Sequence, residues 1–144
     1  GGMLLASQGI SEYFLVINGD TFIEIDLKKM LDFHLKVRSE WTMAVIKLND
    51  SDRYMGIDIK DNSRIMSVNS NTDLANGGVY LINPSAIERV KYKQNKKVSL
   101  EDELLPEFIL NKGLLYGFES FGSFVDIGIP EDYSNASKIL KSII

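Results

Sequence analysis

Two aspartates that follow short apolar runs are the strongest candidates for chemistry in this chain. Asp20 ends the sequence Asn-Gly-Asp after the apolar run 13–17, and Asp126 ends the run 124–126 before a turn that leads into a helix. The carboxyl ends of strands in an open α/β sheet are where ligands bind. Magnesium prefers hard oxygen ligands and usually takes one or two carboxylates plus substrate phosphates, so the pair predicts a Mg²⁺ site. An ordinary turn at Asp20 and an ordinary helix cap at Asp126 remain open alternatives.

Three glycines within or before predicted strands are the next candidates. Gly77 and Gly78 precede an apolar run, and Gly56 interrupts the run 54–58. Glycine weakens a strand unless a bulge, a turn or the close approach of a ligand needs the space, so either a ligand-facing or a structural role fits these positions. The glycine-rich signatures of dinucleotide and P-loop sites, G-x-G-x-x-G and the Walker loop, do not occur in the sequence.

Composition excludes several kinds of site. The 144 residues contain no cysteine and one histidine, His34, which rules out disulfides, thiol catalysis and zinc sites built from Cys and His clusters. His34 lies beside Leu35 in an amphipathic pattern, so we predict a packed side chain rather than a catalytic base. The net charge of −4 argues against nucleic acid as a partner, because binding to its backbone needs clustered positive charge. Without a membrane-length apolar run or a signal peptide, a cytoplasmic protein with no membrane partner is expected.

The elements that must position these residues follow from the apolar spacing. Residues 13–17 predict a strand buried on both faces, Asp26 predicts the cap of a helix that runs to about residue 38, and residues 42–48 predict the next buried strand. A strand-helix-strand unit predicts an α/β fold with a mixed, mostly parallel sheet flanked by helices.

The remaining pattern is more varied. It predicts a hairpin, one further strand and a short helix, then a helix that Ser99 caps and Pro106 divides. Two more strands and a terminal helix that begins at Pro130 follow, and the ranges are given in this order. Their ranges are 54–59 with 64–68, 78–82, 85–90, 99–113, 114–119, 123–127 and 130–140, with 91–97 as a loop. The absence of a linker or repeat predicts one domain over residues 1–144.

Five segments together resemble the sugar-1-phosphate nucleotidyltransferases, also called nucleotide-sugar pyrophosphorylases. They are Leu-Val-Ile-Asn-Gly-Asp at 15–20, Asp-Arg-Tyr-Met-Gly-Ile at 52–57, Asn-Gly-Gly-Val-Tyr at 76–80, Ser-Leu-Glu-Asp at 99–102 and Val-Asp-Ile-Gly-Ile-Pro-Glu-Asp-Tyr at 125–133. The likeness covers nearly the whole chain and is greatest to the short enzymes that activate heptose or mannose 1-phosphate, often with GTP. It implies a Rossmann-like nucleotidyltransferase fold.

The resemblance also implies a reaction and roles for particular residues. Such enzymes transfer a nucleoside monophosphate from a nucleoside triphosphate to a sugar 1-phosphate and release pyrophosphate, so these two substrates are the expected partners, and a homo-oligomer is a further expectation. By analogy, Asp20 and Asp126 are the catalytic residues and hold Mg²⁺. The implied substrate-binding residues are Gly2 on the base side, Asn18 and Gly19 beside Asp20, and Gly56, Asn76, Gly77 and Glu101 on the sugar side.

The chain departs from the family pattern in two places. The family's glycine-rich loop with an arginine, and the lysine that follows it, do not occur before residue 20. We therefore expect the chain to be the carboxyl-terminal portion of a longer enzyme, without the amino-terminal strands, cut near Gly1-Gly2 and inactive alone; the alternative is a cloning remnant before Met3. The family's Glu-Lys pair is also missing between Ser67 and Asn76, so sugar recognition through that segment is not implied.

Two other classes of function remain open. One is a non-catalytic domain for sugar-nucleotide binding or assembly, which the missing loop favours. The other is a metal-dependent glycosyltransferase, which has a similar sheet. Glycosyltransferases usually carry their metal ligands as Asp-x-Asp, whereas the next aspartate after Asp20 is Asp26 in the predicted helix cap.

Overall fold

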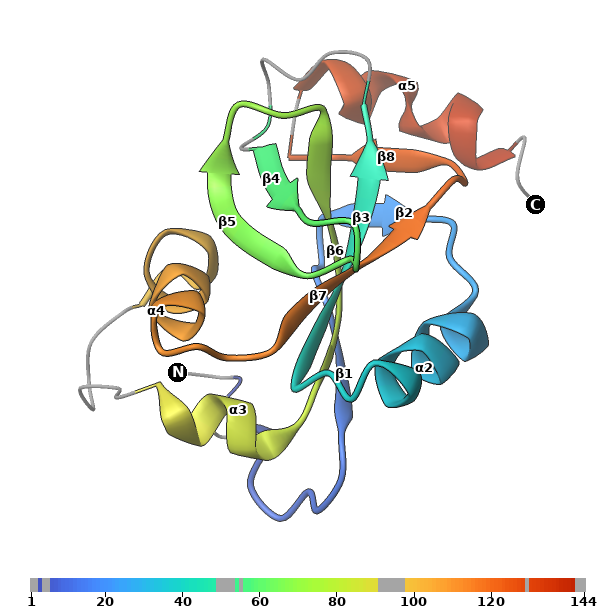
Figure 1. The fold of residues 1–144 in the computed structure, drawn as a ribbon. Helices are drawn as coiled ribbons and strands as arrows, with labels where there is room; N and C mark the ends of the chain where they lie inside the picture. Colours follow the sequence, from blue (N-terminus) through green and yellow to red (C-terminus); the bar gives the residue numbers. More distant parts are fainter. Residues whose placement is uncertain are drawn as a thin grey trace.

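The computed structural model describes residues 3, 6–48, 54, 56–90, 98–128 and 130–141 (Figure 1). Its strands are β1 Phe14–Ile17, β2 Thr21–Ile23, β3 Trp41–Lys47, β4 Gly56–Ile59, β5 Ile65–Ser70, β6 Leu74–Ile82, β7 Leu115–Ser120 and β8 Phe124–Asp126. Its helices are α2 Leu27–Lys36, α3 Pro84–Arg89, α4 Leu105–Leu110 and α5 Pro130–Lys141, with a π-helical turn η2, Leu100–Leu104, before α4. In this described part, no helix combines the length and apolar character that crossing a membrane requires.

The central sheet has the strand order β1-β6-β3-β7. It is mixed and flanked by helices, as predicted, but β3 with β7 is the one parallel pair among the described strands, whereas β1 with β6 and β6 with β3 are antiparallel. The expectation of a mostly parallel sheet is therefore wrong. The expected burial of the first strand on both faces is also wrong, because β1 lies at the sheet edge and leaves Leu15 and Ile17 41% and 58% exposed.

Strand β3 separates two apolar clusters and explains the two-sided core. Trp41, Met43 and Val45 face the cluster covered by α3, η2 and α4, whereas Ala44 and Ile46 face the cluster covered by α2. Successive side chains of a strand point to opposite faces, so a central strand with helices on both sides must be apolar throughout. The prediction of a buried strand here is confirmed, and Figure 1 shows α2 and the α3–α4 layer on opposite sides of the sheet.

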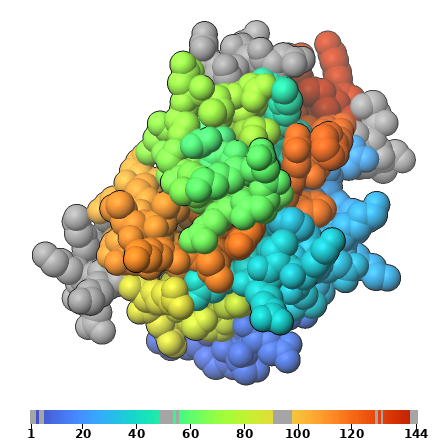
Figure 2. Space-filling model, in the orientation of Figure 1, coloured from blue at the N-terminus to red at the C-terminus, as the bar shows by residue number. Residues whose placement is uncertain are grey.

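Two small ribbons complete the fold. The predicted hairpin is present as β4–β5, turning through Ser63, whose φ is +65°, and Figure 2 shows it on the surface next to the orange α4 region. The second ribbon pairs β2 with β8. The sequence did not predict β2, because a run of three residues carries no readable alternation.

The divided helix near Pro106 is also confirmed. Ser99 caps it by accepting a hydrogen bond from Asp102 N at 3.2 Å, and Leu104 N donates to Ser99 O at 3.1 Å, which makes a wide π-type turn. Proline has no N–H to donate, so α4 begins next to it. The wide turn carries Glu101, one of the predicted site residues.

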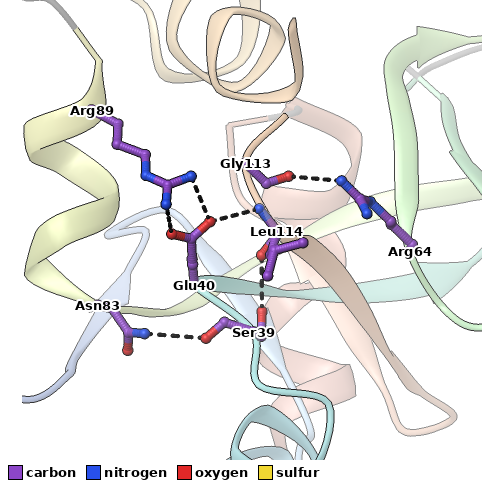
Figure 3. A network of polar contacts seen from close by, with 7 residues as sticks. All are labelled: Ser39, Glu40, Arg64, Asn83, Arg89, Gly113 and Leu114. Atoms are coloured by element: carbon purple, nitrogen blue, oxygen red, sulfur yellow. Dashed lines mark hydrogen bonds and ion pairs between the residues drawn. The ribbon is translucent and has the colours of Figure 1, made fainter. Parts of the chain in front are cut away.

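A polar network around Glu40 joins the starts of β3 and β7 to α3 (Figure 3). Glu40 Oε1 lies 2.8 Å from Arg89 Nη2, and Glu40 Oε2 accepts a hydrogen bond from Leu114 N at 2.9 Å. Ser39 Oγ donates to Leu114 O at 3.2 Å. These contacts stabilise the parallel pairing of β3 with β7 at its beginning, where Arg64 of the hairpin turn also donates to Gly113 O at 3.5 Å (Figure 3).

His34 is part of the core, as predicted, and is 2% exposed. Its Nε2 donates to Asn83 Oδ1 at 3.1 Å, which leaves Nδ1 to accept from Thr42 Oγ1 at 2.8 Å. This arrangement uses the neutral imidazole, and burial lowers the pKa of His34 below its usual 6.5.

We expect this histidine to make the fold acid-sensitive. Because the unfolded chain binds the proton more readily, the free energy of unfolding should be complete above about pH 6.5 and fall as the pH drops through the lowered pKa of His34. His34→Gln should reduce that pH dependence, because the glutamine side chain cannot take up a proton. The contribution of the carboxylates is common to both proteins, so the difference between them reports on His34. Urea denaturation at pH 7.5 and pH 5.5 measures the difference, and equal losses of stability in both proteins would contradict the assignment.

Gly56 begins β4 where the pairing with β5 is irregular. A Cβ at this position would overlap Ser70 O and lie 2.6 Å from Thr72 N. Backbone atoms of residues 70 and 72 therefore fill the space in which a side chain at position 56 would lie. The geometry supports a structural role for Gly56, and its expected place on the sugar side stays a prediction.

A substitution at Gly56 should accordingly act on stability. Gly56→Ala is expected to lower the free energy of unfolding by about 1–3 kcal/mol, because the backbone of residues 70 and 72 must move. Gly19→Ala is the matched control, since a Cβ there would meet nothing within 4 Å. Urea denaturation of both variants tests this, and a Gly56→Ala protein as stable as the control would show that the hairpin does not need glycine.

Candidate functional site

A cleft of about 310 Å³ opens beside the β2–β8 ribbon, the hairpin and η2. Its lining residues are Asn18, Asp20, Thr21, Met43, Tyr54, Ile57, Val68, Asn69, Asn76, Glu101, Leu105 and Asp126. Five of the predicted site residues are among them: Asn18, Asp20, Asn76, Glu101 and Asp126. Gly19, Gly56 and Gly77 are not in this lining, and Gly2 lies outside the described residues.

The pairing of β2 with β8 brings Asp20 and Asp126 together. Thr21 is the register partner of Asp126, and Ile127 N donates to Asp20 O at 2.9 Å. The two aspartates are therefore adjacent, as expected. The same expectation made the strands that end at Asp20 and Asp126 direct neighbours in the sheet, and this part is wrong. The strand before Asp20, β1, pairs with β6, whereas the short strand after it makes the contact with β8.

The carboxylates themselves also lie close together. The Cβ position of Gly128, built from its backbone, is 3.0 Å from Asp126 Oδ1 and 3.9 Å from Asp20 Oδ2. The two oxygens are thus no farther apart than these two distances combined. Gly128 N donates to Asp126 Oδ1 at 2.9 Å and orients that carboxylate.

This donor set fits a divalent cation that keeps other ligands. Two carboxylates supply the hard oxygens that magnesium prefers, and Mg²⁺ usually retains waters and substrate phosphates besides one or two carboxylates. Among the described residues, no three His, Cys, Asp or Glu side chains gather closely enough to form a complete metal cage. A cation held here would therefore keep positions for water or phosphate oxygens.

On another wall of the cleft, Asn76 holds Glu101 in place. Asn76 Nδ2 donates to Glu101 Oε1 at 2.5 Å and to Tyr80 Oη at 2.6 Å, and Asn76 Oδ1 accepts from Gly78 N at 3.0 Å. Tyr80 is fully buried, and burial raises the pKa of its phenol well above the usual value, so the hydroxyl stays neutral. The amide is occupied by the protein, which indicates that Asn76 supports the Glu101 carboxylate.

The two glycines after Asn76 serve packing. Gly78 has a φ of +74°, and a Cβ there would overlap Thr21 Oγ1; a Cβ at Gly77 would lie 2.5 Å from Ile23 Cδ1. Both glycines allow β2 to pack across β6, beside the register shift between Met43 and Val45. Gly77 thus has a packing role against β2, and its expected contact with the sugar stays a prediction.

Sequence reasoning missed Thr21 and Asn69, which line the cleft, and Tyr80, which is buried and accepts a hydrogen bond from Asn76. Thr21 and Tyr80 lie within or next to segments that were singled out, yet an apolar strand context gave no reason to select them. Asn69, with a φ of +70°, lies in the segment where the family's Glu-Lys pair is absent, so that segment reaches the cleft with an amide instead of a lysine. Position in a motif could have suggested Tyr80, which follows Asn76 by four residues.

Comparisons with known proteins identify the family of this chain. The family model described as nucleotidyl transferase matches residues 3–142. D-glycero-alpha-D-manno-heptose 1-phosphate guanylyltransferase of Aneurinibacillus thermoaerophilus is 35% identical over 137 residues, which are 92% of this chain and 58% of that protein. Mannose-1-phosphate guanylyltransferase 1 of Arabidopsis thaliana is 32% identical over 88% of this chain and 36% of its own length.

Solved structures show the same fold. The crystal structure of HddC from Yersinia pseudotuberculosis superposes with a TM-score of 0.78 at 29% identity and covers 99% of this chain and 61% of that chain. A second HddC structure, complexed with GMP-PN, gives the same values. The chain thus spans about three fifths, or less, of the proteins that it matches. With nearly its whole length matched by the family model, the chain belongs to the nucleotidyl transferase family.

Proposed function

We propose that the protein containing this chain transfers a nucleoside monophosphate from a nucleoside triphosphate to a sugar 1-phosphate. The names of the relatives favour GTP as the donor and mannose or manno-heptose 1-phosphate as the acceptor. The observation that carries the proposal is the close approach of the Asp20 and Asp126 carboxylates at one cleft. This chain would supply the carboxyl-terminal part of the nucleotidyltransferase domain, in the cytoplasm.

The reaction requires the two substrates to be positioned and the charge of their phosphates to be stabilised. An oxygen of the sugar phosphate attacks the α-phosphorus of the triphosphate, the new phosphoanhydride bond forms, and pyrophosphate leaves with the electrons of the broken bond. Little covalent work falls to the protein, so it must align the two phosphates and balance their charge. Asp20 and Asp126 would hold Mg²⁺, which when bound neutralises phosphate charge.

Glu101 is the residue that would recognise the sugar. An ionised carboxylate only accepts hydrogen bonds, and sugar hydroxyls are donors. Asn76 holds one carboxylate oxygen from inside the protein, so the Glu101 carboxylate is already oriented when the sugar arrives. Asn18 and Asn69 add amide groups to the same cleft. Preorganisation of this kind lowers the cost of ordering the site on binding.

A binding-only domain is the second candidate, because the described lining of the cleft contains no lysine or arginine. Cationic groups that clamp the triphosphate can account for several powers of ten in rate. A pyrophosphate-release assay on the complete protein with Mg²⁺, GTP and mannose 1-phosphate separates the two functions. Turnover supports the transferase, whereas nucleotide-sugar binding without turnover supports the binding domain.

The sugar side of the cleft can be tested directly by ligand NMR on this chain. With Mg²⁺ and GDP-mannose, saturation-transfer signals should be strong on the mannose protons, and Asp126→Asn should reduce them severalfold. Asp61→Asn, which removes an exposed carboxylate at the hairpin turn, is the control and should keep them. Signals that are equally strong in the Asp126→Asn protein would contradict the proposed role of Asp126 in holding the Mg²⁺ that neutralises the charge of the ligand's phosphates.

The support of Glu101 by Asn76 and Tyr80 gives a further prediction. Tyr80→Phe removes the hydroxyl that accepts from Asn76, so GDP-mannose should bind about three- to tenfold more weakly, the range expected for one hydrogen bond. Tyr133→Phe is the matched control, because Tyr133 is 68% exposed on α5. Calorimetric titration measures both affinities, and an unchanged affinity in Tyr80→Phe would show that Asn76 holds Glu101 without the phenol.

A further inference from the structure

Gly128 differs from the other glycines of the cleft region in what surrounds it. The three atoms nearest to its Cβ position all belong to the two aspartates: Asp126 Oδ1 at 3.0 Å, Asp20 Oδ2 at 3.9 Å and Asp126 Cγ at 4.0 Å. By contrast, Gly77 is next to Ile23 and Gly56 is next to backbone. Packing of the fold therefore explains those glycines and leaves Gly128 unexplained.

Backbone conformation does not explain Gly128 either. Among the described residues, the glycines with a positive φ are Gly9 and Gly78, so the backbone at Gly128 is one that alanine can adopt. Gly128 is also exposed, which removes core packing as a reason. What a side chain here would change is the space next to the two carboxylates.

We infer that Gly128 is a positioning residue of the carboxylate pair, keeping open the coordination positions beside Asp20 and Asp126 and orienting Asp126 through its N–H. This inference rests on the proposed function, because it assumes that the pair holds a divalent cation. The N–H of Gly128 engages Asp126 Oδ1 at 2.9 Å, and a carboxylate oxygen can accept this hydrogen bond and still offer its second lone pair to a cation.

The distances explain why a methyl group at position 128 would interfere with cation binding. With metal–oxygen distances of about 2.1 Å and octahedral geometry, neighbouring ligand oxygens of Mg²⁺ are about 3 Å apart. The Cβ position lies at that distance from Asp126 Oδ1. A methyl group there would occupy the position of a coordinated water or phosphate oxygen. It would leave the cation one ligand short, because a methyl group cannot coordinate a metal. It would also press on Asp126 Oδ1 and disturb the hydrogen bond that orients it.

The test is direct cation binding by the 144-residue chain, with Mn²⁺ as the probe because carboxylate sites accept Mg²⁺ and Mn²⁺ alike. Electron paramagnetic resonance of free Mn²⁺ gives the dissociation constant without any catalytic assay. Gly128→Ala should weaken binding at least about tenfold, equivalent to about 1.4 kcal/mol. Ile127→Ala is the matched control: it alters the neighbouring side chain, adds no atom near the carboxylates and keeps the N–H that donates to Asp20 O.

Asp126→Asn distinguishes a failure of the proposed cation site from a failure of the role of Gly128 alone. If the unchanged chain binds Mn²⁺ and Asp126→Asn does not, a Gly128→Ala protein within twofold of the unchanged chain overturns the role of Gly128 alone. If the unchanged chain fails to bind, or Asp126→Asn binds as well, the proposed cation pair fails and the role of Gly128 fails with it. Urea denaturation of Gly128→Ala accompanies the titration. A loss of cooperative unfolding would also contradict the inference, since it would assign Gly128 to the fold.

Discussion

The antiparallel pairing of β2 with β8 is the contact on which the candidate site depends. It joins segments from opposite ends of the chain through three residues on each side, with Thr21 opposite Asp126. Hydrogen bonds at both ends reinforce it: Ile127 N donates to Asp20 O, and Glu24 N donates to Ser123 O at 2.8 Å. Since a two-stranded ribbon alone is marginally stable in water, its stability must come from what it packs against.

That support comes from β6, which is why glycines lie at 77 and 78. Removing both side chains lets Thr21 and Ile23 approach the strand, and Ile23 then joins the apolar cluster with Met30 and Val79. The same strand carries Asn76 and Tyr80, which hold Glu101 on η2. One bulged strand thus positions the carboxylate pair through β2 and the third carboxylate through Asn76.

Strong local signals made much of the fold predictable from sequence. Asp26 caps α2, Pro106 divides the helix after Ser99, and the apolar β3 is central. β2 was missed because pairing with a distant segment, and not its own sequence, makes it a strand. In the cleft, Asp20 and Asp126 were found by type and position. The packing roles of Gly56 and Gly77 could not be predicted from the sequence, because the contacts that require glycine there, Ser70 O and Ile23 Cδ1, come from other segments.

The central claim is that Asp20 and Asp126 bind one cation between them. The most direct measurement is a crystal structure of the chain grown with MnCl₂, with anomalous diffraction data to locate manganese independently of the surrounding atoms. We predict a single anomalous peak within bonding distance of one carboxylate oxygen from each aspartate, with the β2–β8 pairing intact. A peak bound by only one of the two, or no peak at this cleft, would contradict the claim.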